Sequence, residues 1–301
     1  MVDGGRYRKI ATPFSFKATL DFIGIFVRVP QDSPAGISQQ TVHTPLAERE
    51  DARMKRILPC KRSVIVAADV PDYPTLGNLA NAVRDVPGIS GFKIGSLLGL
   101  AGLADAVRIV RRYELSTPII YDHQKWGNDI PEMGNPFAAQ LARSGVDAAI
   151  LFPFAGPATQ EAYTKACFDV GLQVITGGIM THPKFLVSEG GYIADETVER
   201  IYRFACQLGV QHFVVPGNKV DWVRRIRAIL VEELGVGEGN FVLYAPGFIT
   251  QKGDISECGQ AAGDEWHAIV GSAIYGKPTP EAQYEAALTV TAQIGATSKN
   301  V

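Results

Sequence analysis

The chain has 301 residues, 46% hydrophobic and 20% charged, an ordinary composition for a folded soluble protein of one large or two small domains. Its formal net charge of -2 indicates neither a nucleic-acid partner nor an anionic membrane. The four cysteines are widely spaced and form no Cys-x-x-Cys pair, which favours free thiols in a reducing cytoplasm over a zinc site or disulfides. No apolar stretch reaches the roughly 18 to 20 residues that a membrane-spanning helix needs.

The first part of the chain, residues 1–53, differs from the remainder. It carries Gly4-Gly5, scattered prolines and a polar run from Gln31 to Arg53, and no helix or strand period that would bury a core. A clean strand pattern begins only after Met54. We therefore expect residues 1–53 to be an extension that is either disordered or, if translation starts at Met54, not native. Residues 54–301 are expected to form the folded domain.

From Ser63 onward, continuous apolar runs alternate with amphipathic stretches, and such runs are typical of strands buried on both faces. The predicted strands are Ser63–Ala68, Gly91–Ile94, Pro118–Tyr121, Ala148–Phe152, Gln173–Thr176, His212–Val215, Phe241–Ala245 and His267–Val270. Helices are predicted near 75–86, 99–113, 135–144, 157–170, 194–209, 219–234, 256–263 and 279–294.

About eight strand–helix units in roughly 240 residues have the size and rhythm of a (β/α)8 TIM barrel of the α/β class. The alternative is an open doubly wound sheet, which would prefer a glycine-rich phosphate loop after the first strand. The first strand instead ends in Ala67-Ala68-Asp69-Val70-Pro71. The barrel is therefore favoured, and in a barrel the chemistry belongs on the loops that follow the strands.

The third strand leads into the most highly charged of these loops, Tyr121-Asp122-His123-Gln124-Lys125-Trp126-Gly127-Asn128-Asp129-Ile130-Pro131. Asp122, Lys125 and Asp129 place two carboxylates and an ammonium within eight residues. Such a group is poorly suited to a core and well suited to a charged reaction site. Taken alone, however, such a motif is more often a solvated loop, since loops between strands and helices are generally polar.

The other strand ends strengthen the case for a reaction site. Asp69 follows the first strand, and Lys93 lies in Phe92-Lys93-Ile94-Gly95 at the end of the second. Glycines and an amide donor follow the last two strands, in Pro246–Asp254 and Val270–Tyr275. Barrels commonly bind a phosphate at that position through backbone N–H groups and a helix N-terminus.

Together with Met180-Thr181-His182-Pro183 after the fifth strand, these motifs resemble orotidine 5′-monophosphate decarboxylase over roughly residues 60–295. Each motif alone is weak, but their order and their positions at strand ends match the family. The resemblance implies a cytoplasmic homodimer of barrels in pyrimidine biosynthesis. Such an enzyme converts orotidine monophosphate to uridine monophosphate without a metal or cofactor.

The resemblance also implies residue roles. Lys93, Asp122, Lys125 and Asp129 would form a network of alternating charge in which Asp129 reaches the partner subunit's site and Lys125 protonates C6 of the pyrimidine. Ribose contacts would come from Asp69, Lys93 and Asp129. Thr181 would read the pyrimidine edge, while His182 is expected to be structural. The phosphate would be held by Gln251, Gly271 and Ser272, with Lys252 as a candidate cation.

Three departures from the family pattern point to a divergent branch. The family spaces its central motif D-x-K-x-x-D, whereas each gap is one residue longer in the segment from Asp122 to Asp129. Met133 stands where the family has threonine. Ser272 stands where the family has the arginine that binds phosphate.

Three other functions compete with this interpretation. Magnesium-dependent decarboxylases and aldolases of keto-sugar phosphates share the superfamily, but they usually carry a glutamate where this chain has Lys93. A barrel that binds a nucleotide without catalysis would accommodate Ser272 and Met133. The third alternative is an unrelated phosphate-binding barrel, such as a biosynthetic isomerase.

Overall fold

A computed structural model describes residues 54–114, 116–122, 128–236, 239–248 and 253–296. The predicted N-terminal extension, residues 1–53, lies outside the described residues, so its boundary stays a prediction. Lys125, Gln251 and Lys252 also lie outside the described residues, so the roles predicted for them stay predictions.

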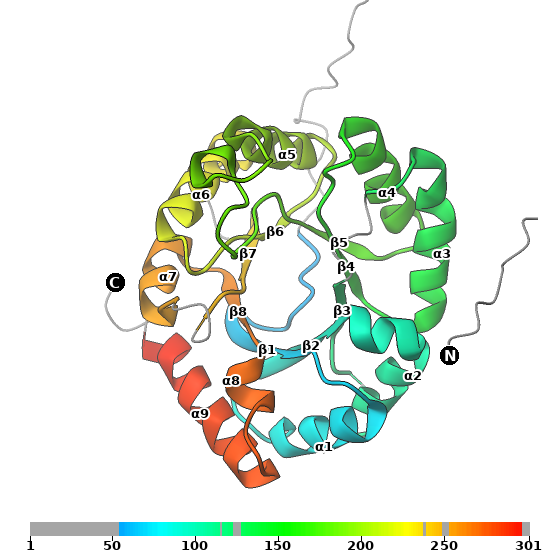
Figure 1. Ribbon diagram of the computed structural model, residues 1–301, viewed down its shortest axis with the longest axis vertical. Coiled ribbons are helices and arrows are strands. Elements are labelled where there is room, and N and C mark those ends of the chain that lie inside the picture. Colours follow the sequence, from blue (N-terminus) through cyan, green and yellow to red (C-terminus); the bar gives the residue numbers. More distant parts are fainter. Residues whose placement is uncertain (1–53, 115, 123–127, 237–238, 249–252, 297–301) are drawn as a thin grey trace, which may run out of the picture. The chain divides into compact units, whose positions relative to one another are not determined.

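Eight parallel strands close into a barrel in which each strand pairs with the next and β8 pairs with β1 (Figure 1). The predicted TIM barrel is therefore confirmed. The strands are β1 Arg62–Ala68, β2 Ile89–Gly95, β3 Ile119–Asp122, β4 Ala148–Leu151, β5 Gln173–Thr176, β6 His212–Val214, β7 Val242–Ala245 and β8 Trp266–Val270.

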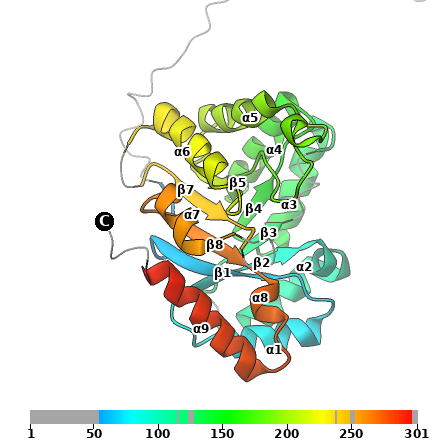
Figure 2. The same cartoon turned by 60° about the vertical axis from the view of Figure 1, so that its left-hand side comes forward.

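Helices surround the ring of strands, and α9 packs against α1 and α7 where the barrel closes (Figures 1 and 2). None of the helices in the described ranges is both long and apolar enough to cross a bilayer. The helices are α1 Tyr73–Val83, α2 Ser96–Arg111, α3 Gly134–Ser144, α4 Pro157–Asp169, α5 Asp195–Gln207, α6 Val220–Leu234, α7 Ile255–Ala262, α8 Ser272–Tyr275 and α9 Pro280–Ala296, with short 3-10 turns η2 Pro131–Met133 and η3 Val187–Glu189.

The sequence pattern located the strands and the longer helices, but it missed the start of α2 and the short elements α8, η2 and η3. Helix α2 begins at Ser96 rather than near residue 99, because its first turn carries the exposed Leu97 and Leu100 and so breaks the core-facing period. The four-residue helix α8 is too short to show a period. The four cysteines are free, as predicted.

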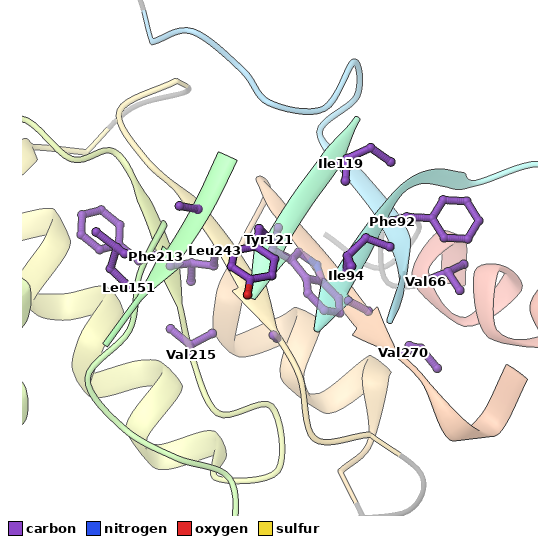
Figure 3. Close-up of a cluster of buried hydrophobic side chains, with 14 of the residues drawn as sticks. Val66, Phe92, Ile94, Ile119, Tyr121, Leu151, Phe213, Val215, Leu243 and Val270 are labelled. Carbon is purple, nitrogen blue, oxygen red and sulfur yellow. The ribbon is translucent and has the colours of Figure 1, made fainter. Parts of the chain in front are cut away.

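Alternate residues of each strand serve two apolar layers. On β1, Ile65 and Ala67 point into the barrel, whereas Val64 and Val66 face the helices. Figure 3 shows part of the outer layer, to which β2 contributes Phe92 and Ile94. Full burial of such a side chain stabilises the fold by about 1.5 to 3 kcal/mol. This period of two dictates which strand residues face the barrel axis.

The end of the barrel where the strands begin is closed by a buried polar cluster. His212 donates through Nε2 to the Lys55 carbonyl at 3.2 Å, and its Nδ1 accepts from the Tyr244 hydroxyl at 3.1 Å. His267 Nδ1 lies 2.7 Å from Ser63 Oγ. Burial lowers the pKa of His212 to about 4 and that of His267 to about 3, with Arg56 adding to both shifts. Both rings are therefore neutral in the folded chain at neutral pH.

This cluster predicts a loss of stability in mild acid. The folded-state pKa values lie below the ordinary histidine value of 6.5, so the unfolded chain takes up protons first as the pH falls from 6.5 toward 4. The penalty should approach about 2 kcal/mol per histidine at pH 5.

Urea denaturation at pH 7 and pH 5 measures this loss. The His212→Gln, His267→Gln double variant should show a smaller drop between the two pH values than the parent. The exposed His182 supplies the control, because His182→Gln removes a histidine without disturbing the buried cluster. Equal drops in all three proteins would contradict the assignment.

Candidate active site

A cavity of about 380 Å³ lies at the end of the barrel where the strands finish. Every strand, or the loop that follows it, contributes to the wall. The lining residues are Ala67, Asp69, Lys93, Asp122, Ile150, Phe152, Ile179, Met180, Thr181, His182, Val214, Pro246, Gly247, Phe248, Ile269, Gly271, Ser272 and Tyr275. The predicted residues Asp69, Lys93, Asp122, Thr181, Gly271 and Ser272 are thus brought together.

Lys93 occupies an inward-facing position of β2. It is in register with Ala67 on β1 and Ile120 on β3, two residues of the apolar barrel interior. A charged amine in such surroundings loses its hydration and needs charged partners in exchange. The strand order supplies them, because β1 and β3 flank β2 and each is followed or ended by an aspartate.

The Lys93 ammonium lies between two carboxylates. Its Nζ is 3.1 Å from Oδ1 of Asp69 and 3.1 Å from Oδ2 of Asp122. The side chains of Lys93 and Asp122 are each 9% exposed, whereas that of Asp69 is 43% exposed. Burial works to lower the pKa of Lys93, but the charges of Asp122 and Asp69 outweigh it and hold the pKa above its ordinary value. Lys93 is therefore a fixed positive charge.

Gly95, the last residue of β2, makes room for this arrangement. A Cβ atom at that position would lie 2.3 Å from Oδ1 of Asp69 and 3.6 Å from Nζ of Lys93. A side chain there would displace the Asp69 carboxylate. The Phe92-Lys93-Ile94-Gly95 motif thus provides both the Lys93 ammonium and, through Gly95, the space that the Asp69 carboxylate occupies.

Asp122 uses only one of its two oxygens within the described part of the chain. Oδ2 pairs with Lys93, while Oδ1 is buried and has no hydrogen-bond partner among the described residues. The next residues of the chain, 123–127, lie outside the described ranges and include Lys125.

Asp129 is the described candidate that does not join the cavity. Its Oδ1 accepts from the amide of Ile130 at 2.7 Å, and its carbonyl accepts from the Thr159 hydroxyl at 2.8 Å. The side chain is exposed and lies outside the lining. Within the described chain, Asp129 is therefore not brought together with Asp69, Lys93 and Asp122.

Sequence reasoning missed several lining residues. Tyr275 stands three positions after Ser272 and lines the cavity because both lie on the one-turn helix α8, which the pattern did not predict. The apolar wall formed by Ile150, Val214 and Ile269 was also not singled out. The strand period carried that signal, since these residues belong to the inward-facing set.

The sequence matches known proteins over most of the barrel. The model of the "Orotidine 5'-phosphate decarboxylase / HUMPS family" matches residues 62–287, well over half of the chain. The chain belongs to this family. The resemblance inferred from the strand-end motifs is thereby confirmed, and the modest identities described next agree with a divergent branch.

Curated proteins named orotidine 5'-phosphate decarboxylase are similar to this chain over most of its length. The orotidine 5'-phosphate decarboxylase of Methanosarcina barkeri is 29% identical over 236 residues, covering 78% of this chain and 96% of its own. That of Methanosarcina mazei is 28% identical over 233 residues, covering 77% and 95%.

Solved structures agree on the fold. Orotidine 5'-phosphate decarboxylase from Pyrococcus horikoshii superposes with a TM-score of 0.61 and 26% identity, covering 77% of this chain and 99% of that one. The Methanocaldococcus jannaschii enzyme, complexed with the inhibitor BMP, gives a TM-score of 0.65 and covers 78% and 99%; at 20% identity it supports the barrel alone.

The buried charges predict a specific cost for removing Lys93. In Lys93→Met the Asp122 carboxylate stays buried without the cation that pairs with it among the described residues, which should lower the free energy of unfolding by roughly 3 kcal/mol at pH 7. Asp69 is half exposed and contributes little to this cost. Adding Asp122→Leu to the variant should recover much of the loss, because no buried charge then remains unpaired.

Urea denaturation of the parent, of Lys93→Met, of Asp122→Leu and of the double variant measures the effect. Lys165→Met is the control, since the Lys165–Glu161 pair is exposed and should be worth less than about 0.5 kcal/mol. A loss in Lys93→Met no larger than in the control would show that the triad is not a desolvated ion cluster.

Proposed function

We propose that this protein decarboxylates orotidine 5′-monophosphate to uridine 5′-monophosphate. The observation that carries the proposal is the Asp69–Lys93–Asp122 triad, held at the carboxyl ends of β1, β2 and β3 inside the cavity. Family membership and relatives that are named orotidine 5'-phosphate decarboxylase support it. Lys93 takes the place where the magnesium-dependent alternative would need a carboxylate ligand.

The reaction breaks the bond between C6 and the carboxylate carbon, and the electron pair stays on C6 while carbon dioxide leaves. No adjacent π-system readily accepts that pair, so the protein must stabilise it with positioned charge. In our proposal Lys125 provides the ammonium and transfers a proton to C6, giving uridine monophosphate. Solvent then returns a proton to the amine.

The described residues suggest how Lys125 would be held. Oδ1 of Asp122 is buried and free of other described partners, so it is placed to bind an ammonium on the following loop. Lys93 fixes Asp122 through the other oxygen at 3.1 Å. Asp122 would also face the substrate carboxylate, and repulsion between the two would favour loss of carbon dioxide.

The rest of the cavity would bind the substrate. We assign the ribose hydroxyls to Asp69, Lys93 and the partner's Asp129, and the pyrimidine edge to Thr181. The phosphate would lie against Gly271 and Ser272, at the β8 end where barrels commonly hold this group. Gln251 and Lys252 complete this part of the proposal; both lie outside the described residues.

We further propose that the active unit is a cytoplasmic homodimer. Leu100 is 80% exposed on the first turns of α2, and Ile130, next to Asp129, is 59% exposed. Leu97 and Met133 add to the exposed apolar surface at the same end of neighbouring strands β2 and β3. Apolar groups clustered on a surface mark contact sites for partners, and a contact here would bring Asp129 to a second barrel.

The central test is turnover by the purified protein. The absorbance change of orotidine monophosphate should proceed in the presence of EDTA, and Lys125→Ala should abolish it while the protein stays folded. Removing one positioned acid and its charge should raise the barrier by at least about 3 to 4 kcal/mol. Lys165→Ala, an exposed lysine of α4, is the control. Activity of Lys125→Ala within tenfold of the parent would remove Lys125 from the mechanism.

Subunit mixing tests the shared site. Lys125→Ala and Asp129→Ala should each be inactive, yet their heterodimer should regain one working site, which carries Lys125 from one chain and Asp129 from the other. Mixed samples should therefore recover roughly a quarter of parental activity after random exchange. Mixing two batches of the same variant is the control. No recovery after verified exchange would mean that each barrel is self-contained.

A further inference from the structure

The segment after β5 carries four consecutive lining residues, Ile179 to His182, and its backbone is held from outside the cavity. At its start, the amide of Gly178 donates to the buried Tyr202 hydroxyl at 3.2 Å. Farther along, Asn218 Nδ2 donates to the carbonyl of Thr181 at 3.0 Å. Asn218 follows β6 and does not belong to the lining. Asn218 thus fixes the backbone of Thr181, which does line the cavity.

Lys219, the next residue, binds the same segment at two places. Its Nζ donates to the His182 carbonyl at 3.3 Å and pairs with the Glu189 carboxylate. Glu189 in turn accepts from the amide of Phe185 at 3.1 Å. The Lys219 side chain is only 15% exposed, so this pair is more shielded from water than a surface ion pair. One ammonium therefore ties His182 to the turn that follows it.

The β6 loop also supports the described ends of the loop after β7. The amide of Gly217 donates to the Pro246 carbonyl at 2.8 Å. On the far side, Gly253 packs so closely that an added Cβ would lie 3.2 Å from Cα of Asn218 and 2.6 Å from the Gly247 carbonyl oxygen. Asn218 thus contacts both segments that form this side of the cavity, the one after β5 and the one after β7.

We propose that Asn218 and Lys219 are positioning residues that act on catalysis through Thr181. This inference rests on the proposed function, in which Thr181 reads the pyrimidine edge. Neither side chain meets the substrate. Together they hold the carbonyls of Thr181 and His182, and so the part of the cavity wall where Thr181 would meet the pyrimidine. A small displacement of such a group can lower the rate by about a hundredfold.

A double-mutant cycle on kcat/KM for orotidine monophosphate tests the proposal. Asn218→Ala should lower kcat/KM between about tenfold and a hundredfold. Thr181→Ala should lower it at least as much. The combined variant should resemble Thr181→Ala to within about threefold, because a residue that acts through Thr181 has nothing left to position. Losses that multiply across the two sites would overturn the proposal.

Matched controls separate positioning from general destabilisation. Asn240 donates from Nδ2 to the Leu234 carbonyl at 3.0 Å, which is the same kind of bond near the start of β7. Asn240→Ala should lower the free energy of unfolding about as much as Asn218→Ala does and should leave kcat/KM unchanged. For the charge, Lys219→Met should reduce kcat/KM, whereas Lys184→Met, an exposed lysine of the same β5 loop, should not. The proposal would be overturned if Asn240→Ala lowered kcat/KM as much as Asn218→Ala, or if Lys184→Met lowered it as much as Lys219→Met.

Hydrogen–deuterium exchange gives a readout that does not depend on activity. Amides of residues 179–186 should exchange at least about tenfold faster in Asn218→Ala than in Asn240→Ala. If the parent fails to convert orotidine monophosphate, the proposed function fails, while the exchange result still decides whether Asn218 fixes this segment. Unchanged exchange would overturn the positioning role even in an active enzyme.

Discussion

The site depends on one buried ammonium held between two carboxylates. Lys93 points into an apolar barrel, where an unpaired charge would be costly, and the aspartates that compensate it come from the strands on either side. Because the Lys93 ammonium is paired with both carboxylates, the ion pairs also hold the three side chains in position relative to one another. Asp122 is oriented by Lys93, and its other oxygen has no hydrogen-bond partner within the described ranges. A reaction that needs preset charge can begin from this arrangement without reorganisation.

Closure of the barrel is what makes this geometry possible. Parallel pairing in order around the ring puts all strand ends at one edge, so residues distant in the chain, such as Asp69 and Ser272, share one cavity. The loops above the edge then support one another. The contacts of Asn218 and Lys219 show that a wall residue can owe its position to a neighbouring loop that never reaches the cavity.

Much of this arrangement could be predicted from the sequence, for identifiable reasons. Buried parallel strands appear as apolar runs, and charges directly after them, such as Asp69 and Asp122, mark the reactive edge. The sequence placed Lys93 at the end of the second strand, but only its register with Ala67 and Ile120 shows that it points inward. Other features depend on contacts that no local pattern contains. The turn α8 has no period, Tyr275 reaches the cavity only through that turn, and the bond from Asn218 to Thr181 joins residues far apart in sequence.

The polar cluster at the opposite end of the barrel bears on how rate measurements in acid should be interpreted. His212 and His267 favour their neutral forms in the fold, and neither belongs to the cavity. The stability that they remove in mild acid is smaller than the roughly 5 to 15 kcal/mol that holds an ordinary domain folded, so the folded form still dominates at pH 5. The protein does become easier to unfold by heat or denaturant as the pH falls. A pH–rate profile recorded near the unfolding temperature would therefore combine unfolding of the scaffold with ionisation of the reactive charges.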